Sequence, residues 1–239
     1  MPEITLDVFE ITSWLWGLRT PLVQAYAVRD GDGFNLIDTG IAGGEDAILS
    51  GLSGINGQPE GEVVVNDILL THGHDDHTGA AAALKDRTGA RVLASAIDAP
   101  IIEGDRPAHV PHLADWEIPL FHQVTPLVPP APPPVRVDVR LHEGDPLPWD
   151  QPAKVLAAPG HTPGSIAVLF TEARVLVAGD AIASHESQPI LGVFNSGPAE
   201  AIASFRNLAA LDVEIACFGR GAPVLGDARA QLEQVAARL

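Results

Sequence analysis

The stretch Thr71-His72-Gly73-His74-Asp75-Asp76-His77 directly follows an apolar run that extends from Val63 to Leu70. The run is typical of a buried strand, so the histidines fall where that strand ends. Imidazoles and carboxylates within one turn of loop form the ligand mixture that borderline metals such as zinc prefer. Capping of a helix that begins near Thr78 would explain one polar residue but not the whole string. The stretch therefore predicts metal ligands at His72, His74, Asp76 and His77.

Two later motifs place further candidate ligands at strand ends. His161 lies in the turn Pro159-Gly160-His161-Thr162-Pro163-Gly164, and Asp180 ends an apolar strand in Ala178-Gly179-Asp180-Ala181. Taken alone, each residue would more often serve as a turn or cap residue. Open α/β sheets usually bind ligands at the edge where their strands end, so we expect these loops to meet the first cluster there.

In combination these motifs resemble the metallo-β-lactamase superfamily. In that family H-x-H-x-D-H is followed by a histidine in a P-G-H-T-P-G-S-like turn, a G-D aspartate and a late histidine. The resemblance covers essentially the whole chain and includes Ile37-Asp38-Thr39-Gly40. It implies that His72, His74 and His161 hold one metal ion. It also implies that Asp76 and His77 belong to a second site and that Asp180 bridges both.

The hydrophobic pattern predicts an α/β fold in two similar halves. Strands are expected near residues 4–11, 23–28, 34–38, 63–70, 91–94, 135–141, 153–158, 166–170, 174–178 and 213–218, and helices near 45–52, 80–85, 95–103, 198–210 and 227–239. Two halves, each a sheet with helices on one side, can pack sheet to sheet in one domain spanning 1–239. The resemblance implies the same arrangement, an αβ/βα sandwich of two mixed β-sheets flanked by helices.

Residues 104–134 interrupt this pattern. They include the run Pro129-Pro130-Ala131-Pro132-Pro133-Pro134. Such composition favours extended polyproline conformation over a packed helix or strand. We expect either a lid draped over the body or a plain surface connection.

Arg220 departs from the pattern of the family. Where the late histidine is expected, this chain has Phe218-Gly219-Arg220-Gly221. Arginine stays protonated and has no lone pair to give, so it cannot serve as a metal ligand. We therefore expect one firmly bound zinc ion, with iron or manganese as alternatives, and a second site that is weak or empty. Arg220 either replaces the missing cation, pairing with Asp76 or with an anionic substrate group, or is a degenerate position.

Composition disfavours several classes of function. The 31 acidic residues outnumber the 14 basic ones and give a net charge of −17, so a phosphate backbone would be repelled. The single cysteine, Cys217, rules out an intrachain disulfide and fits a reducing compartment. The N-terminal segment has no basic region, and no run of about 18 apolar residues occurs. We expect a cytoplasmic protein with a small-molecule substrate and neither a nucleic-acid nor a membrane partner, and we leave a homodimer open.

In size and motif order the chain resembles the glyoxalase II-like and lactonase-like branches of that family, and this resemblance implies a hydrolase that cleaves an ester, thioester or lactone. The metal would lower the pKa of its bound water to about 7. Asp76 would orient that water or act as a general base. Phosphoester cleavage stays open, whereas the charge disfavours a nuclease and the lack of a secretory signal disfavours a β-lactamase. The alternatives are a mononuclear iron dioxygenase acting on a persulfide, and a non-catalytic member that only binds a ligand.

Other polar and aromatic residues have weaker assignments. Asp38 and Asp75 are expected to orient ligating imidazoles or to form caps and turns. Trp14 and Trp16 either line a substrate cleft or pack inside the protein. The remaining histidines are expected on the surface or packed outside the site: His109, His112, His122, His142 and His185.

Overall fold

Two mixed β-sheets face each other in the computed structural model, which describes residues 4–129 and 131–239. Residues 1–3 of the N-terminal segment and Pro130 of the proline run lie outside the described part. The strands of the first sheet lie side by side in sequence order: β1 (Asp7–Thr12), β2 (Leu15–Arg19), β3 (Gln24–Asp30), β4 (Gly33–Ile37), β5 (Val65–Leu70), β6 (Arg91–Ser95) and β7 (Val139–Leu141). Strands β1 to β4 pair antiparallel, and β4 to β7 pair parallel.

The second sheet has the order β15-β14-β11-β10-β9-β8. Its strands are β8 (Pro146–Leu147), β9 (Ala153–Ala157), β10 (Ile166–Phe170), β11 (Val175–Val177), β14 (Ile215–Cys217) and β15 (Val224–Leu225). Only β11 and β14 pair parallel, so this sheet is mixed as well. A separate hairpin is formed by β12 (Ile182–His185) and β13 (Gln188–Leu191).

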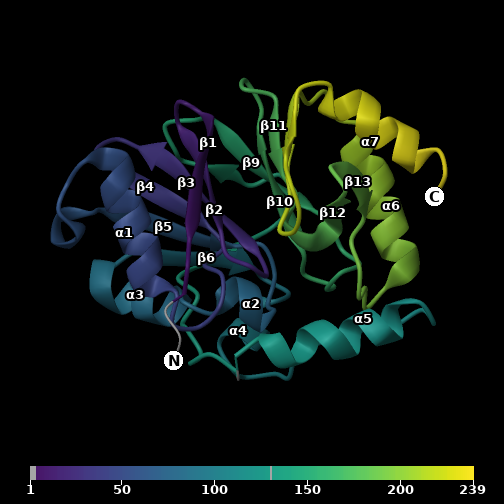
Figure 1. Ribbon diagram of the computed structural model, residues 1–239, viewed down its shortest axis with the longest axis horizontal. Coiled ribbons are helices and arrows are strands. Elements are labelled where there is room, and N and C mark those ends of the chain that lie inside the picture. Colours follow the sequence, from purple (N-terminus) through teal and green to yellow (C-terminus); the bar gives the residue numbers. More distant parts are fainter. Residues whose placement is uncertain (1–3, 130) are drawn as a thin grey trace.

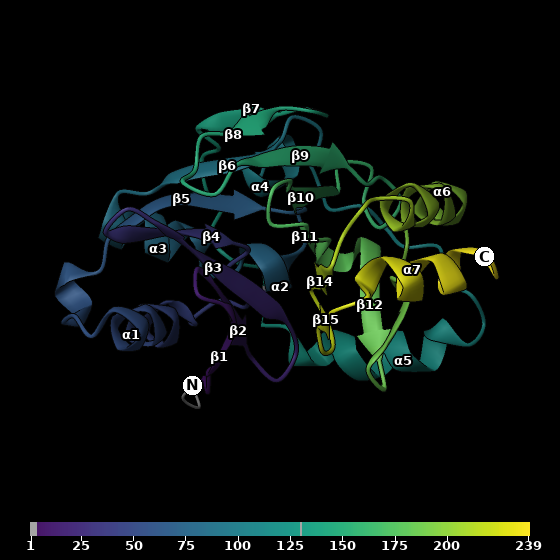
Figure 2. The same ribbon diagram turned by 90° about the horizontal axis from the view of Figure 1, so that it is seen from above.

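Helices cover the outer face of each sheet, as Figures 1 and 2 show. On the first sheet lie α1 (Glu45–Asn56), α3 (Ala81–Thr88) and α4 (Ala99–Ile102), and on the second α6 (Pro198–Ala209) and α7 (Ala228–Ala236). The remaining helical elements are α2 (Asp75–Thr78), α5 (Glu117–Val124), η1 (Glu60–Glu62), η2 (Thr125–Leu127) and η3 (Gly179–Ala181). The predicted αβ/βα sandwich is confirmed.

Side chains alternate between the layers of this sandwich along each central strand. In β5, Ile68 and Leu70 pack under the helices, whereas Leu69 between them belongs to the core shared by the two sheets. In β10, Val168 faces that same shared core, and Leu169 faces α6 and α7. This period of two follows from strand geometry, and both faces are apolar because both are covered.

The ends of strands from both sheets meet at one edge. There Ile166 N donates to Thr71 O at 2.9 Å, which joins the loop after β5 to the second sheet. Gly219 N donates to Gly179 O at 2.8 Å, which joins the loops after β14 and β11. Helix α5 lies near the same edge as α2 (Figures 1 and 2). The predicted convergence of the loops that carry candidate ligands is therefore found.

The expectation of extended structure throughout 104–134 is wrong, because Glu117–Val124 forms α5 and Thr125–Leu127 forms η2. Pro119 is compatible with α5 because it lies in the first turn, where backbone N–H groups have no partner within the helix. The helix expected over 95–103 is restricted to α4, and the sequence patterns did not predict β2, β8, β12, β13 or β15.

Candidate metal centre

The loop that carries the histidine cluster is held by Asp38. Its two carboxylate oxygens accept hydrogen bonds from Thr71 N and Thr71 Oγ1, both at 2.7 Å. Asp38 itself has a left-handed backbone, with φ at 62°, a conformation that a non-glycine residue adopts mainly where surrounding contacts enforce it. The hydroxyl proton of Thr71 goes to Asp38, so Thr71 Oγ1 accepts from His72 Nδ1, which lies 3.0 Å away. The lone pair of His72 is therefore on Nε2.

The second imidazole is oriented in the same manner. His161 Nδ1 lies 3.0 Å from the carbonyl oxygen of Val193, which can only accept a hydrogen bond. The lone pair of His161 is therefore on Nε2, and this atom lies 2.9 Å from His74 Nδ1. Nitrogen atoms of His72, His74 and His161 all lie within 4.8 Å of one another. The three rings thus point nitrogen atoms at a common volume.

The chemistry of these groups fits a metal ion. His72 Nε2 is buried and has no hydrogen-bond partner within the described part of the chain. Buried polar atoms rarely lack a partner, so this nitrogen atom fits the role of a metal ligand. Burial and the neighbouring imidazoles keep the pKa of His72 well below its usual value, lower the pKa of His161, and lower that of His74 to about 3. All three imidazoles are therefore neutral at pH 7 and can donate a lone pair.

A second group consists of His72, His77 and Asp180, again within 4.8 Å of one another. His77 Nδ1 lies 2.8 Å from Asp38 Oδ2, and His77 Nε2 lies 3.3 Å from Asp180 Oδ1. Burial opposes protonation of His77, but the carboxylates of Asp180 and Asp38 outweigh it and raise its pKa well above the usual value. A metal ion at this position would have to displace that proton. His77 Nε2 and Asp180 Oδ1 are nevertheless buried without a hydrogen-bond partner in the described residues, so the second group also offers ligand atoms to a cation.

Arg220 occupies the place between Asp76 and Asp180. Its Nε donates to Asp180 Oδ2 at 2.9 Å, Nη2 donates to Asp76 Oδ2, and Nη1 donates to Leu22 O at 2.9 Å. Burial raises the pKa of both carboxyls, but Arg220 and His77 outweigh it, so the pKa of Asp76 lies below its ordinary value and that of Asp180 well below. Asp76 lies in neither group of candidate ligands, because its carboxylate faces the guanidinium.

The turn that carries Arg220 is fixed by β3. Tyr26 OH donates to Phe218 O at 2.6 Å and accepts from Phe218 N at 3.0 Å. Gln24 N donates to Gly219 O at 2.8 Å. A Cβ atom at Gly219 would lie 2.0 Å from Asp180 Oδ1, so only glycine leaves room for the carboxylate there. Tyr26 and Gln24 were missed in the sequence because nearly two hundred residues separate them from this turn.

Replacing Tyr26 by phenylalanine is expected to lower the free energy of unfolding by about 1–3 kcal/mol, because Phe218 N loses its buried partner and Phe218 O keeps only the hydrogen bond from Gln24 Nε2 at 3.2 Å. The ring and its packing are retained, so urea denaturation should show an unchanged slope and an earlier midpoint. An unchanged midpoint would mean that the hydroxyl does not support the turn.

Asp98 is a further residue that the sequence did not reveal. Its Oδ2 accepts from Gly73 N at 2.9 Å and from Thr162 Oγ1 at 2.7 Å. These two donors neighbour His74 and His161, so one buried carboxylate ties together the two loops that carry the first ligand group. No local motif marks Asp98, which follows β6 in a short turn.

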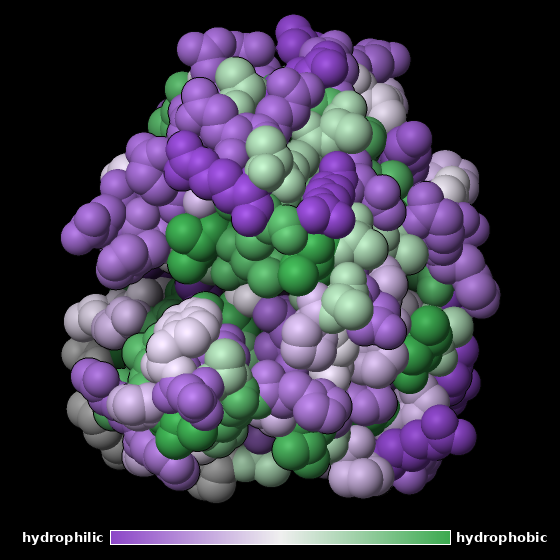
Figure 3. All heavy atoms as spheres, turned by 90° about the vertical axis from the view of Figure 1, so that its right-hand side faces the viewer, coloured by the Kyte–Doolittle hydropathy of each residue, from purple (hydrophilic) through white to green (hydrophobic). Residues whose placement is uncertain are grey.

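A mostly apolar cavity of about 580 Å³ opens onto this centre. Among the sequence candidates, His74, Asp75, Asp76, His161 and Arg220 line it. His109 lines it as well, so this histidine lies closer to the site than expected. The space-filling view of the side that carries α5, α6 and α7 shows hydrophobic residues gathered in a central band and again in the lower part (Figure 3).

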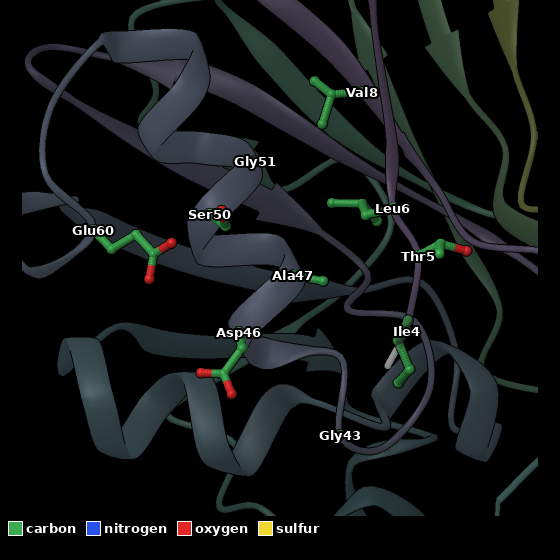
Figure 4. A pocket seen from close by; sticks show the side chains of 10 residues that line it. All are labelled: Ile4, Thr5, Leu6, Val8, Gly43, Asp46, Ala47, Ser50, Gly51 and Glu60. Atoms are coloured by element: carbon green, nitrogen blue, oxygen red, sulfur yellow. The ribbon is translucent and has the colours of Figure 1, made fainter. Parts of the chain in front are cut away.

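The other weakly assigned residues lie elsewhere. Trp14 packs on Phe170, and Trp16 packs edge to face on Phe34. Cys217 is buried in the core between the sheets. Another hollow, of about 790 Å³, lies between the segment after Ile4 and α1, and none of the candidate ligands lines it (Figure 4).

Comparison with known proteins agrees with this geometry. The family model of the Metallo-beta-lactamase superfamily matches residues 19–220. The probable metallo-hydrolase YflN of Bacillus subtilis is 28% identical over 254 residues, which cover 97% of this chain and 93% of YflN. The hydroxyacylglutathione hydrolase of Fuscovulum blasticum is 33% identical over 157 residues, which cover 65% of this chain and 48% of that enzyme. The match thus takes in about half of the hydroxyacylglutathione hydrolase.

Solved structures share the fold. A metallo-beta-lactamase family protein of Thermus thermophilus has a TM-score of 0.67 at 24% identity, covering 100% of this chain and 79% of that one. BJP-1, a subclass B3 metallo-beta-lactamase of Bradyrhizobium japonicum, has a TM-score of 0.67 at 19% identity, covering 97% and 91%. In the described residues of the present chain, no helix has the length and apolar character needed to span a membrane.

Proposed function

Because the chain belongs to the metallo-beta-lactamase superfamily and carries the site of a metal-dependent hydrolase, we propose that it cleaves an ester, thioester or lactone with a single metal ion. The ion is held by His72, His74 and His161. Three imidazoles that leave one position open are the ligand set of catalytic zinc sites, so we propose zinc. The observation that carries this proposal is the set of three neutral histidines, of which His72 and His161 are buried and oriented by hydrogen bonds at Nδ1.

The relatives support the type of bond. The hydroxyacylglutathione hydrolases act, by name, on an acyl derivative of glutathione. A divalent ion bound in the first group would supply a water molecule with a pKa near 7 and would polarise the carbonyl under attack. As part of the same proposal, the substrate is a small molecule and the protein works in the cytoplasm.

Asp76 and Arg220 have complementary roles in this proposal. His77 and the guanidinium outweigh burial and hold the pKa of Asp76 below its ordinary value, so Asp76 stays ionised and is a weak proton acceptor. Its carboxylate lies at the cavity wall beside His74, where it accepts a hydrogen bond from the attacking water and orients it. Arg220 takes the place of a second cation, because it forms ion pairs with both Asp76 and Asp180.

One specific observation favours a second candidate, the iron dioxygenase. The group of His72, His77 and Asp180 has two imidazoles and one carboxylate, the ligand set of mononuclear non-haem iron enzymes. The contacts of His77 with two carboxylates weigh against it. Iron in the purified protein, together with oxygen consumption on a persulfide, would establish this candidate in place of the hydrolase.

Elemental analysis of the protein is expected to find one zinc ion per chain, and the Arg220→His variant is expected to bind two. The new imidazole adds a ligand next to Asp180 and frees Asp76. A panel of ester, thioester, lactone and phosphodiester substrates should show hydrolysis of an acyl substrate by the unaltered chain. If only Arg220→His hydrolyses a substrate, the unaltered chain is a non-catalytic member of the family. Two zinc ions in the unaltered chain would contradict the proposal that Arg220 takes the place of a second cation.

A further inference from the structure

The cavity above the metal centre is roofed by α5 and the segment that follows it. Leu120, Phe121 and Val124 of α5 line the roof, and Phe194 lines the cavity beside Phe121. The rings of Phe121 and Phe194 pack edge to face, with centroids 5.2 Å apart. His74 and His161 also line the cavity, so a group under α5 would be adjacent to the position of the metal ion.

The roof is fixed in place by polar contacts at its base. The buried Glu117 of α5 accepts hydrogen bonds from Phe194 N and from Ala114 N, both at 2.8 Å. His112 Nδ1 donates to Ser196 O at 2.6 Å. These contacts tie the N-terminal end of α5 and the segment before it to the loop behind His161, so this part of the roof is held in place before a substrate enters.

Charge around the cavity disfavours an anionic substrate. Among its described lining residues the charged ones are Asp75, Asp76 and Arg220. The guanidinium already forms ion pairs with Asp76 and Asp180, so it does not attract a substrate carboxylate strongly. The chain as a whole carries a net charge of −17, which adds long-range repulsion of anions.

We propose that the substrate is an uncharged ester or thioester whose acyl group is a medium-length alkyl chain bound under α5. This proposal rests on the proposed function. The alkyl chain contacts Leu120, Phe121 and Phe194, and its carbonyl reaches the metal centre. In the thioester case the water oxygen bonds to the acyl carbon, the carbon–sulfur bond breaks, and a water proton passes to the thiolate. The products are a carboxylic acid and a neutral thiol.

Three thioesters test this proposal with the zinc-loaded chain: S-acetyl-N-acetylcysteamine, S-hexanoyl-N-acetylcysteamine and S-hexanoylglutathione. Each buried methylene strengthens binding about fourfold, so hexanoyl, with four more methylenes, is expected to exceed acetyl by about 250-fold in kcat/KM on the same thiol. The glutathione thioester carries carboxylates and is expected to be at least about tenfold worse than the uncharged hexanoyl thioester. Equal rates for acetyl and hexanoyl, or a preference for glutathione, would overturn the proposal.

A matched pair of variants on α5 locates the alkyl chain. Leu120 lines the cavity and is 36% exposed, whereas Ile118 is 40% exposed and lies outside the lining. Leu120→Ala is expected to lower the hexanoyl-to-acetyl ratio of kcat/KM about fivefold, because alkyl contact area is lost. Ile118→Ala removes a side chain of the same size and should leave the ratio unchanged. Equal effects of the two variants would overturn the placement under α5.

A binding measurement separates this proposal from the proposed function. S-hexyl-N-acetylcysteamine and S-hexylglutathione are thioethers that cannot be hydrolysed, and calorimetry measures their affinity for the zinc-loaded chain directly. Stronger binding of the uncharged thioether supports the cavity assignment even if no thioester is cleaved, an outcome that would reject only the hydrolase. Equal or stronger binding of S-hexylglutathione would overturn the cavity assignment.

Discussion

Replacement of His72 by alanine is expected to remove the bound metal ion and to lower kcat/KM about 1,000-fold or more. His72 belongs to both groups of candidate ligands, so neither arrangement survives its loss. A metal ion contributes several kcal/mol of transition-state stabilisation, and each 1.36 kcal/mol corresponds to about a factor of ten in rate. Elemental analysis of the variant and its hydrolysis of the best acyl substrate measure the two effects.

Two further variants decide which group holds the ion. His74→Ala is expected to lose the metal, because His74 is part of the first group only. His77→Gln is expected to keep it, because His77 is part of the second group only. The reverse result would place the ion with His77 and Asp180 and would favour the iron-type site.

The control for these variants is His185→Ala. His185 is exposed on the hairpin of β12 and β13, so its loss should change neither metal content nor rate. Thermal unfolding of the zinc-depleted proteins shows whether His72→Ala still folds. A folded His72→Ala protein that retains one ion per chain would contradict both assignments of the metal centre.

The part of the metal centre that could be predicted from the sequence consists of residues in short motifs directly after strands. The string from His72 to His77 follows an apolar strand, and His161 and Asp180 also follow strands, so sheet geometry alone brings them to one edge. The pairing of Arg220 with Asp76 is different, because 144 residues separate the two. The sequence offered this pairing only as one of two interpretations, since chemistry excludes arginine as a ligand but does not show what it contacts.

The sequence patterns failed to predict β2, the hairpin of β12 and β13, and α5, and each failure has a physical reason. In β2, four successive residues from Leu15 to Leu18 are buried, so the alternation that marks a half-buried strand is absent. The hairpin of β12 and β13 turns at Glu186 and Ser187, both with positive φ, where glycine or asparagine would be the usual signal. Helix α5 was hidden by the prolines around it, although a proline in a first helical turn is compatible with a helix.

Replacement of Arg220 by methionine is expected to lower the free energy of unfolding of the zinc-depleted protein by about 3–5 kcal/mol at pH 6, because removal of one partner leaves buried charges without compensation. Asp76 and Asp180 are both buried, and Arg220 is the arginine that contacts them. Urea denaturation measures the loss. The matched control is Arg174→Met, whose exposed ion pair with Asp212 should contribute little.

The pH dependence of this loss follows from the pKa values of the two carboxyls. Arg220 and His77 outweigh burial and hold both pKa values below the ordinary value of about 3.9. Groups with a lowered pKa in the folded protein stabilise it fully above the unfolded pKa, and this contribution disappears as pH falls through the folded pKa. The difference between the unaltered chain and Arg220→Met should therefore be largest above about pH 5 and shrink below about pH 4.

Zinc should partly reverse the effect of Arg220→Met. Without the guanidinium, Asp76 and Asp180 offer oxygen ligands beside His77, so a cation can take over the neutralisation that Arg220 provides. Excess zinc is then expected to restore more stability to Arg220→Met than to Arg174→Met, because an ion that binds only the folded state shifts the unfolding equilibrium. Equal gains in both variants would mean that Arg220 does not occupy the place of a second cation.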